Sequence, residues 1–361
     1  MGNAGIGRMR EGCHPALGIN MIKCVIIGVG GGRARGLAEA YGHVTRGRLA
    51  AVSTRRRDRL DAFAAEFGVP ARYTDYREMF EREKPDLVHV NTPPSVRLEI
   101  FESAESAGVP AVLVEKPLAI QGEDFLTIQA FARSARVKIA VNHQLHFHPH
   151  RGRLQRQVHD GAIGNLRFIE ASAGMNPAYQ GTHAMQAISA FNPGAAPIAV
   201  FGQASGADGL AETPRHHYAP DECTGIIDFD NGVSALLRCG AVAPRVIPGG
   251  STNVHKRIAV YGDRGFAHWT MHGWESRIDD VYERGEHVYA EEDILGQAAM
   301  TEAMIDWLED DAAVHPLNID SALSDFSVIL GIYESALNRA VVSLPFTPSP
   351  DLVGKLRATL G

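Results

Sequence analysis

Short apolar runs alternate with helix-like stretches over the first part of the chain. Five runs are largely continuous in apolar residues, as parallel strands covered on both faces are: 24–28, 48–53, 87–91, 111–115 and 137–142. Stretches with helical character separate them, at 34–41, 58–67, 76–83, 95–107 and 122–135. Because strands joined through helices form right-handed crossovers, the pattern predicts an α/β fold with a doubly wound parallel sheet, a Rossmann domain, over residues 21–141.

The pattern changes after residue 142. Strand-like runs now follow one another without helices between them, at 166–172, 199–205, 224–229, 233–241 and 257–261. Asp230-Asn231-Gly232 separates two of these runs as a hairpin turn would. Two helix-like stretches come last, at 297–308 and 319–339. The sequence therefore predicts a second, α+β domain over residues 142–361, with a mostly antiparallel sheet.

Composition excludes several classes of protein. Residues 1–20 have no continuous apolar stretch, which predicts a flexible extension rather than a signal peptide. No run reaches the roughly 18 apolar residues that span a bilayer. The net charge of −7, with both signs interspersed, argues against nucleic acid as a partner. The cysteines lack metal-ligand spacing and favour reduced thiols in a cytoplasmic protein: Cys13, Cys24, Cys223 and Cys239.

A glycine-rich turn separates the first apolar run from the first helix-like stretch. Gly28 permits a tight turn, and Gly30 lets the backbone approach a pyrophosphate. The third glycine of the dinucleotide fingerprint is replaced by Arg33. Either Gly31 and Gly32 shift the register, or Arg33 itself contacts phosphate. The strand–turn–helix context predicts a dinucleotide cofactor.

The end of the second apolar run bears on the choice between NAD and NADP. NAD-binding domains place an acidic residue there for the ribose hydroxyls. This chain has Ser53, Thr54 and Arg55, with no carboxylate before Asp58. Hydroxyl and guanidinium groups suit a 2′-phosphate, although a solvated helix start would also look like this. The sequence favours NADP over NAD.

Lys116 follows the apolar run 111–115 as part of Glu115-Lys116-Pro117. Ligands of open parallel sheets bind at the carboxyl ends of the strands. A lysine directly after a core strand therefore indicates a cleft, where its donors can orient a hydroxyl or carbonyl group. The alternative is a surface lysine in a loop.

Together these motifs resemble the glucose–fructose oxidoreductase / inositol dehydrogenase (Gfo/Idh/MocA) family, from about residue 21 to residue 345. Further markers carry the resemblance: Thr92-Pro93-Pro94, Gly108, Leu118-Ala119, Pro149, the turn 160–164, Gly181-Thr182-His183 and the segment 261–265. The resemblance implies a Rossmann domain followed by a domain with an open-faced sheet. It also implies NAD(P)-dependent chemistry on a sugar or polyol, and a homodimer or homotetramer assembled through that sheet.

The resemblance also implies roles for individual residues. Lys116 corresponds to the family lysine that positions the reacting hydroxyl, and the bond to Pro117 can be cis. Further cofactor contacts are implied for Thr92, Pro93 and Glu115. His183 corresponds to the family histidine, but the usual aspartate four residues earlier is Tyr179. At an ordinary pKa near 10, a tyrosine is a poor base at neutral pH. His183 is therefore the best remaining acid/base, with Tyr179 as a hydrogen-bond donor.

Polar residues near these positions are expected to contact the substrate: Asn142, His143, His146, His148, Gln180 and Thr182. The alternating histidines at 146, 148 and 150 raise the alternative of a metal site, but no carboxylate or cysteine lies near them in the sequence. We therefore expect no metal.

Two other functions stay open. The missing aspartate leaves room for a redox-neutral hydrolase or isomerase that retains NAD. A non-catalytic sensor of nucleotide or sugar is less compatible with the presence of Lys116 and His183.

Overall fold

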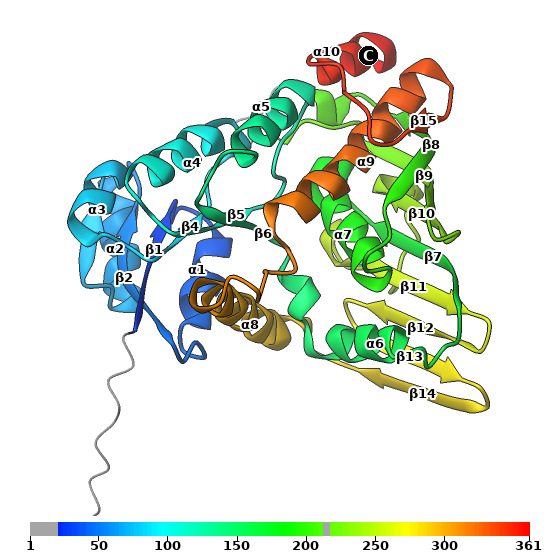
Figure 1. Ribbon diagram of the computed structural model, residues 1–361, viewed down its shortest axis with the longest axis horizontal. Helices are drawn as coiled ribbons and strands as arrows, with labels where there is room; N and C mark the ends of the chain where they lie inside the picture. The colour runs from blue at the N-terminus through cyan, green and yellow to red at the C-terminus, as the bar shows by residue number, and fades with distance from the viewer. Residues whose placement is uncertain (1–20, 212–216) are drawn as a thin grey trace, which may run out of the picture.

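The computed structural model describes residues 21–211 and 217–361; the extension expected at residues 1–20 lies outside them. Six parallel strands form the first sheet, in the order β3-β2-β1-β4-β5-β6 (Figure 1). Their bounds are β1 Ile22–Ile27, β2 Gly47–Ser53, β3 Ala71–Tyr73, β4 Leu87–Val90, β5 Ala111–Glu115 and β6 Lys138–Asn142. This strand order is that of a dinucleotide-binding Rossmann domain, so the predicted doubly wound sheet is confirmed.

Five α-helices connect these strands: α1 Gly32–Ala40, α2 Arg57–Phe67, α3 Tyr76–Glu83, α4 Arg97–Ser106 and α5 Gly122–Ala132. Local sequence sets their ends. Helix α2 ends at Gly68, whose φ of 63° is left-handed and favours glycine. Helix α3 begins after Asp75, whose side chain accepts a hydrogen bond from the Arg77 amide. A 3₁₀ turn, η1 (Pro94–Val96), leads into α4.

Nine strands form the second sheet, in the order β14-β13-β12-β11-β7-β10-β9-β8-β15. Only β7 and β10 pair in parallel among the described strands of this sheet, so the expected mostly antiparallel sheet is confirmed. The strand bounds are β7 Leu166–Ala173, β8 Pro197–Ser205, β9 Glu222–Phe229, β10 Ser234–Cys239, β11 Lys256–Gly262, β12 Gly265–Thr270, β13 Gly273–Ile278, β14 Val281–Glu286 and β15 Val342–Ser343.

Sequence patterning did not predict the three strands at one edge of this sheet, β12 to β14. None of the residues of β14 is fully buried, and β13 buries one residue, Ser276. Strands without a buried apolar face lack the periodic signal on which such predictions depend. Strands β13 and β14 join the sheet through backbone pairing, which hydropathy does not reveal, whereas β12 also buries Ala267 and Trp269.

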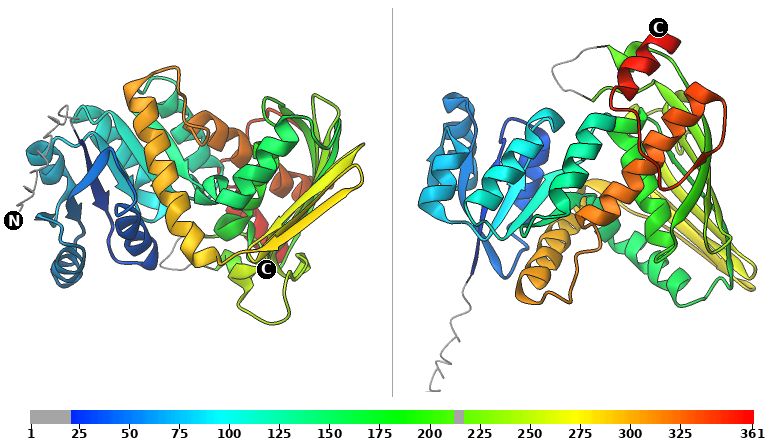
Figure 2. Two further views of the ribbon diagram at one scale, coloured as in Figure 1. Left: turned by 90° about the horizontal axis from the view of Figure 1, so that it is seen from below. Right: turned by 45° about the horizontal axis from the view of Figure 1, so that its top comes forward.

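The remaining helices are α6 Pro149–His159, α7 Thr182–Phe191, α8 Tyr289–Glu309, α9 Ile319–Asn338 and α10 Leu352–Leu360. Single turns complete the fold: η2 Gln144–Phe147, η3 Pro177–Gly181, η4 Asp208–Leu210, η5 Gly240–Val242 and η6 Thr252–Val254. Helices α7 and α9 cover the inner face of the nine-stranded sheet, which lies at the other end of the molecule from β1 to β3 (Figure 2).

Helix α8 joins the two sheets. It follows the nine-stranded sheet in the chain but packs against α1. Its Met300 and Met304 are buried together with Cys24 of β1 and Leu113 of β5. The helix starts at Tyr289, eight residues before the start expected from the sequence, because its first turns are polar and reach into the region between the sheets. We propose that residues 21–141 and 142–361 form two domains, with α8 of the second domain packed against the first.

The outer face of the nine-stranded sheet presents apolar side chains. Ile198, Phe201 and Ile226 are 46%, 41% and 50% exposed. The residues next to them along the strands, such as Val200 and Ile227, are buried, so the face toward α7 and α9 is the core face. No helix in the described residues is long and apolar enough to cross a membrane.

Candidate active site

The glycine turn leaves space for a phosphate. Gly28 has a φ of 89°, and a Cβ atom there would lie 2.8 Å from the carbonyl oxygen of Asn91. Gly31 and Gly32, by contrast, have open space where their Cβ atoms would be. Gly31 precedes α1 without a side-chain cap, so the first amides of α1 are free to bind an anion. These features fit the pyrophosphate of a dinucleotide.

Residues that follow β2 surround this turn. The Gly28 amide donates to the Ser53 carbonyl oxygen over 2.8 Å, and the Ser53 side chain is buried. Thr54 is partly exposed and Arg55 exposed. Sequence reasoning missed Arg59, whose Nη1 lies 2.9 Å from the position of a Gly30 Cβ. Arg59 lies about one helical turn after Ser53-Thr54-Arg55. The fold of α2 brings it to the glycine turn, and no signal in the sequence indicated this.

Thr92 and Pro93 follow β4 beside the same turn, and the Thr92 methyl lies 3.5 Å from the position of a Gly28 Cβ. The Thr92 hydroxyl is buried without a hydrogen-bond partner in the described residues. Beneath it, the buried Arg97 donates to the carbonyl oxygens of Thr92 and Lys116, over 3.1 and 3.4 Å. Arg97 thus holds together the two loops that border the cofactor site.

Lys116 and Tyr179 are in direct contact. The Lys116 ammonium donates a hydrogen bond to the Tyr179 carbonyl oxygen, and it lies 4.7 Å from the centre of the Tyr179 ring, within the range of a cation–π interaction. The Lys116-Pro117 bond is cis. Burial lowers the pKa of Lys116 to about 8, although the Glu115 carboxylate opposes this effect. The lysine therefore keeps its proton at pH 7 but releases it at a mildly basic pH.

Glu115 and Arg33 belong to a charged network beside this lysine. Arg33 lies 3.7 Å from Glu115 and 3.2 Å from Asp293 of α8. Asn142 donates to Glu115 over 2.6 Å, and Gln144 donates to Asp293 over 2.8 Å. Arg33 therefore points into the space between the domains. The sequence offered no signal for Asp293, since its approach depends on the packing of α8 on α1.

His183 is paired with His143. Their Nδ1 atoms lie 3.2 Å apart, and the two rings meet edge to face. Burial and nearby positive charge lower the pKa of His143 to about 3 and that of His183 well below its usual value. Both imidazoles are therefore neutral at pH 7, and one Nδ1 donates its proton to the other. The sequence named both residues but did not predict that they form a pair.

A second lysine, Lys256, faces the same site from the start of β11. Its ammonium donates to the Asn253 carbonyl oxygen over 2.8 Å. Burial, Lys116 and Arg33 together lower its pKa to about 7. Sequence reasoning missed this residue because it read 257–261 as an ordinary core strand. Lys256 is the first residue of a strand with antiparallel neighbours, so the signal that identified Lys116, a lysine at the carboxyl end of a parallel strand, does not apply to it.

Beside Tyr179 lies a cavity of about 360 Å³, a volume suited to a small ligand. Lys116 and His183 do not line it, but Tyr179 borders it and also contacts Lys116. Arg245 and His255 line its far wall. Gln180 Oε1 and Thr182 Oγ1 are buried without hydrogen-bond partners in the described residues, so they remain able to bind a ligand.

The other histidines expected at the substrate lie elsewhere. His146 Nδ1 is 3.1 Å from the Gln186 amide nitrogen and borders a different cavity, next to α7 and α9, which His143 also lines. His148 packs against Trp269, His287 and Tyr289. Asn142 uses its amide to hold Glu115. The structure therefore groups His143, Gln180 and Thr182 with the catalytic candidates, and it groups His146 and His148 with other residues.

The arrangement defines a nicotinamide-dinucleotide-binding fold with a lysine and histidine site at the strand ends. Residues 22–143 match the family described as "Oxidoreductase family, NAD-binding Rossmann fold". These residues match the Rossmann-domain model of the Gfo/Idh/MocA family, and the resemblance noted in the sequence is confirmed for this domain.

Individual relatives agree with this assignment. The chain is 29% identical over 201 residues to dTDP-3,4-didehydro-2,6-dideoxy-alpha-D-glucose 3-reductase from Actinomadura kijaniata, an alignment covering 53% of this chain and 60% of that protein. The fold of the present chain is similar to that of an oxidoreductase from Agrobacterium radiobacter solved with NAD+, L-tartaric acid and magnesium. The TM-score is 0.75 at 18% identity, and the alignment covers 89% of this chain and 98% of that chain. The fold also matches aldose-aldose oxidoreductase from Caulobacter crescentus, with a TM-score of 0.71, 20% identity, and 90% and 100% covered.

Proposed function

We propose that this protein is an NAD(P)-dependent oxidoreductase that transfers a hydride to or from a secondary hydroxyl or carbonyl group of a sugar, sugar acid or polyol. The observation that carries the proposal is the position of Lys116. Lys116 directly follows β5, and its charge is one of the causes that lower the pKa values of His143 and His183. No other described lysine directly follows a strand of the first sheet.

The residues divide the chemistry as follows. Lys116 donates a hydrogen bond to the reacting oxygen and stabilises negative charge that develops on it. Tyr179 orients that ammonium through its carbonyl oxygen and its ring. His183 exchanges the hydroxyl proton, and His143 accepts or returns a proton across the 3.2 Å contact. When bound, the nicotinamide supplies or accepts the hydride.

Positive charge on the substrate side favours an acidic substrate. Lys256 is buried near enough to Lys116 for that charge to lower its pKa, and its ammonium donates hydrogen bonds to the Asn253 carbonyl oxygen and the Met271 sulfur, neither of which carries a charge. Arg245 lines the adjacent cavity and has no ion pair among the described residues. Arg245 is exposed, but Lys256 is a buried cation without a carboxylate partner. Such a cation is costly, and an anionic group on the substrate would offset that cost. We therefore favour a sugar acid or a phosphate-bearing sugar over a neutral polyol.

The decisive experiment measures nicotinamide reduction with NAD+ and NADP+ on matched neutral, carboxylated and phosphorylated sugars. We expect turnover of an acidic member and loss of at least 100-fold in kcat for Lys116→Met. Failure of every substrate with both cofactors would contradict the proposal. Turnover without net change in nicotinamide absorbance, by protein that retains bound cofactor, would instead support the redox-neutral alternative.

A second experiment tests whether Lys256 binds an acidic group of the substrate. Lys256→Met should raise KM for the acidic substrate at least tenfold and leave a neutral analogue unaffected, while Lys256→Arg retains most of the affinity. The carboxylated and phosphorylated arms of the panel separate the two sources of charge. Equal effects on neutral and acidic substrates would refute the assignment.

Two arginines support NADP as the cofactor. Arg56 and Arg57 pair with Asp58 and Asp61 on the surface. Arg55 and Arg59 form no ion pair with any described residue, and Arg59 reaches the glycine turn. A guanidinium in this position suits a 2′-phosphate.

The open face of the nine-stranded sheet supports assembly as a homodimer or homotetramer. Ile198, Phe201 and Ile226 form an exposed apolar group on β8 and β9, and such patches commonly mark interfaces. Light scattering of the purified protein tests this; Phe201→Glu should shift it toward monomer. The buried, free Cys24, Cys223 and Cys239 are compatible with a cytoplasmic location.

A further inference from the structure

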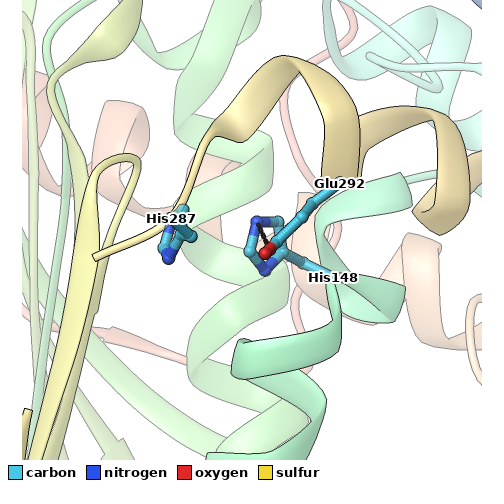
Figure 3. A group of neighbouring side chains, drawn as sticks. All are labelled: His148, His287 and Glu292. Atoms are coloured by element: carbon cyan, nitrogen blue, oxygen red, sulfur yellow. Dashed lines mark ion pairs between the residues drawn. The ribbon is translucent and has the colours of Figure 1, made fainter. Parts of the chain in front are cut away.

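Three potential metal ligands meet outside the catalytic group. His148 precedes the first turn of α6, His287 lies between β14 and α8, and Glu292 lies in the first turn of α8. One ligand atom from each residue lies within 4.8 Å of the other two (Figure 3). Figure 3 shows the two imidazoles and the carboxylate directed toward one another from three separate segments. The cluster is therefore a product of the tertiary fold.

The ligand atoms lack other partners. His148 is 1% exposed, and both of its ring nitrogens are buried without a hydrogen bond in the described residues. The same holds for both ring nitrogens of His287 and for Glu292 Oε2. His148 Nε2 lies 2.7 Å from Glu292 Oε2, but this contact does not satisfy either atom as a hydrogen bond. Buried polar atoms without hydrogen-bond partners are rare and costly, so their concentration in one cluster points to a binding site for a cation.

The donors fit zinc. Two imidazoles and one carboxylate form a three-ligand zinc set, which leaves a fourth position for water or another residue. Zinc–ligand bonds of about 2.0–2.2 Å hold tetrahedral ligands about 3.4 Å apart. The distances between the three ligand atoms, which are at most 4.8 Å, would therefore change by about 1.4 Å or less. His150 is the nearest further ligand, with its Nε2 3.3 Å from Glu292 Oε1. We propose that His148, His287 and Glu292 bind one zinc ion.

The surroundings suit a structural role for this ion. The His148 ring meets the ring of Trp269 edge to face at 5.1 Å and lies parallel to that of Tyr289 at 6.5 Å. Aromatic walls exclude water and strengthen metal–ligand bonds. The ion would connect the start of α6, the end of β14 and the start of α8. Glu292 immediately precedes Asp293. The ion would therefore also hold in position the Asp293 carboxylate that pairs with Arg33.

The expectation of no metal depended on the absence of a carboxylate near the histidines in the sequence. The fold supplies that carboxylate from α8, and it replaces the alternating histidines 146 and 150 with His287 as the second imidazole. His146 takes no part, because its Nδ1 lies against Gln186.

The test uses the full-length protein and zinc alone. Protein stripped with a chelator is dialysed and titrated with ZnCl₂ against a chromophoric competitor, and metal content is measured by elemental analysis. We expect one zinc per chain and a higher unfolding temperature with zinc than with chelator. MgCl₂ should give neither effect, because the donors are mainly nitrogen.

Variants decide whether these residues hold the ion. His287→Gln and Glu292→Gln should each weaken zinc binding at least tenfold and abolish the zinc-dependent rise in unfolding temperature. His268→Gln is the matched control, because His268 also contacts a glutamate, Glu275, over 3.0 Å but lies outside the cluster. Circular dichroism confirms folding of each variant, and Glu292→Gln preserves side-chain volume should His287→Gln fail to fold. Absence of stoichiometric binding, or equal binding by His287→Gln and wild type, overturns the proposal and leaves an aromatic packing cluster.

Discussion

Replacing Lys116 with methionine should remove activity and stabilise the protein at the same time. The charged form of Lys116 is disfavoured in the folded state, since burial lowers its pKa from 10.5 to about 8. At 1.36 kcal/mol per pKa unit, holding the proton at pH 7 costs roughly 3 kcal/mol of folding stability. Methionine keeps the length of the side chain without the charge, so Lys116→Met should recover most of that amount while it loses the hydrogen bond to the substrate.

The stabilisation expected for Lys116→Met depends on pH. Below pH 8 the lysine is protonated in both the folded and the unfolded chain, so the full cost applies. Between pH 8 and 10.5 the unfolded chain binds more protons, and the stability of the wild type therefore rises with pH. Above pH 10.5 both states are neutral and the cost has disappeared. The stabilising effect of Lys116→Met should accordingly be largest at pH 7 and fade toward pH 10.5.

Thermal unfolding of cofactor-free protein measures the effect. With an unfolding entropy of about 2.1 cal/mol/K per residue, roughly 3 kcal/mol corresponds to about 4 °C for this chain at pH 7. Lys355→Met is the control, because Lys355 is exposed on α10 and should give no pH-dependent gain. An unfolding temperature unchanged by Lys116→Met at pH 7, or a gain that persists at pH 10.5, would refute the assignment of a buried, strained charge.

Three further predictions concern the cofactor turn and the histidine pair. Gly28→Ala should destabilise the protein by about 1–3 kcal/mol, because the φ of Gly28 is 89° and an added Cβ would contact backbone. Chemical denaturation measures this loss. Gly31→Ala should be as stable as the wild type in the same assay, yet bind NADPH at least tenfold more weakly in a fluorescence titration. Arg59→Ala should raise the Kd for NADP+ about tenfold and leave that for NAD+ within twofold, and equal losses for both would contradict a contact with the 2′-phosphate. His143→Phe and His183→Phe should each lower kcat at least tenfold with little change in KM. The double variant should lose little more than either alone, because the two histidines act as one unit; additive losses would show independent roles.

Much of the nucleotide-binding half could be predicted from the sequence. Continuously apolar runs separated by helices specify a parallel sheet, and a glycine-rich turn after the first run specifies where a phosphate binds. Lys116 could be identified for the same reason, because the end of a core strand in such a sheet is by rule at the ligand edge. These signals are local, and each is contained within about ten residues.

The second half was less accessible. Strands β13 and β14 lack a buried apolar face, so hydropathy gave no sign of them. Strand β12 buries Ala267 and Trp269 but was not predicted either. The first turns of α8 are polar because they pack against the polar interior of the site, and the sequence alone could not distinguish that from exposure to solvent. Asp293 therefore remained unnoticed although it pairs with Arg33.

By itself, the sequence determined the class of fold, the position of the cofactor turn and the lysine beside it. Only the tertiary structure decided which side chains share a site. It paired His183 with His143, brought Lys256 to the lysine, and placed Glu292 between His148 and His287. The physical reason is that strand and helix periodicity are encoded by neighbours in the chain, whereas charge partners and metal ligands are set by how α7, α8 and the second sheet pack on the first.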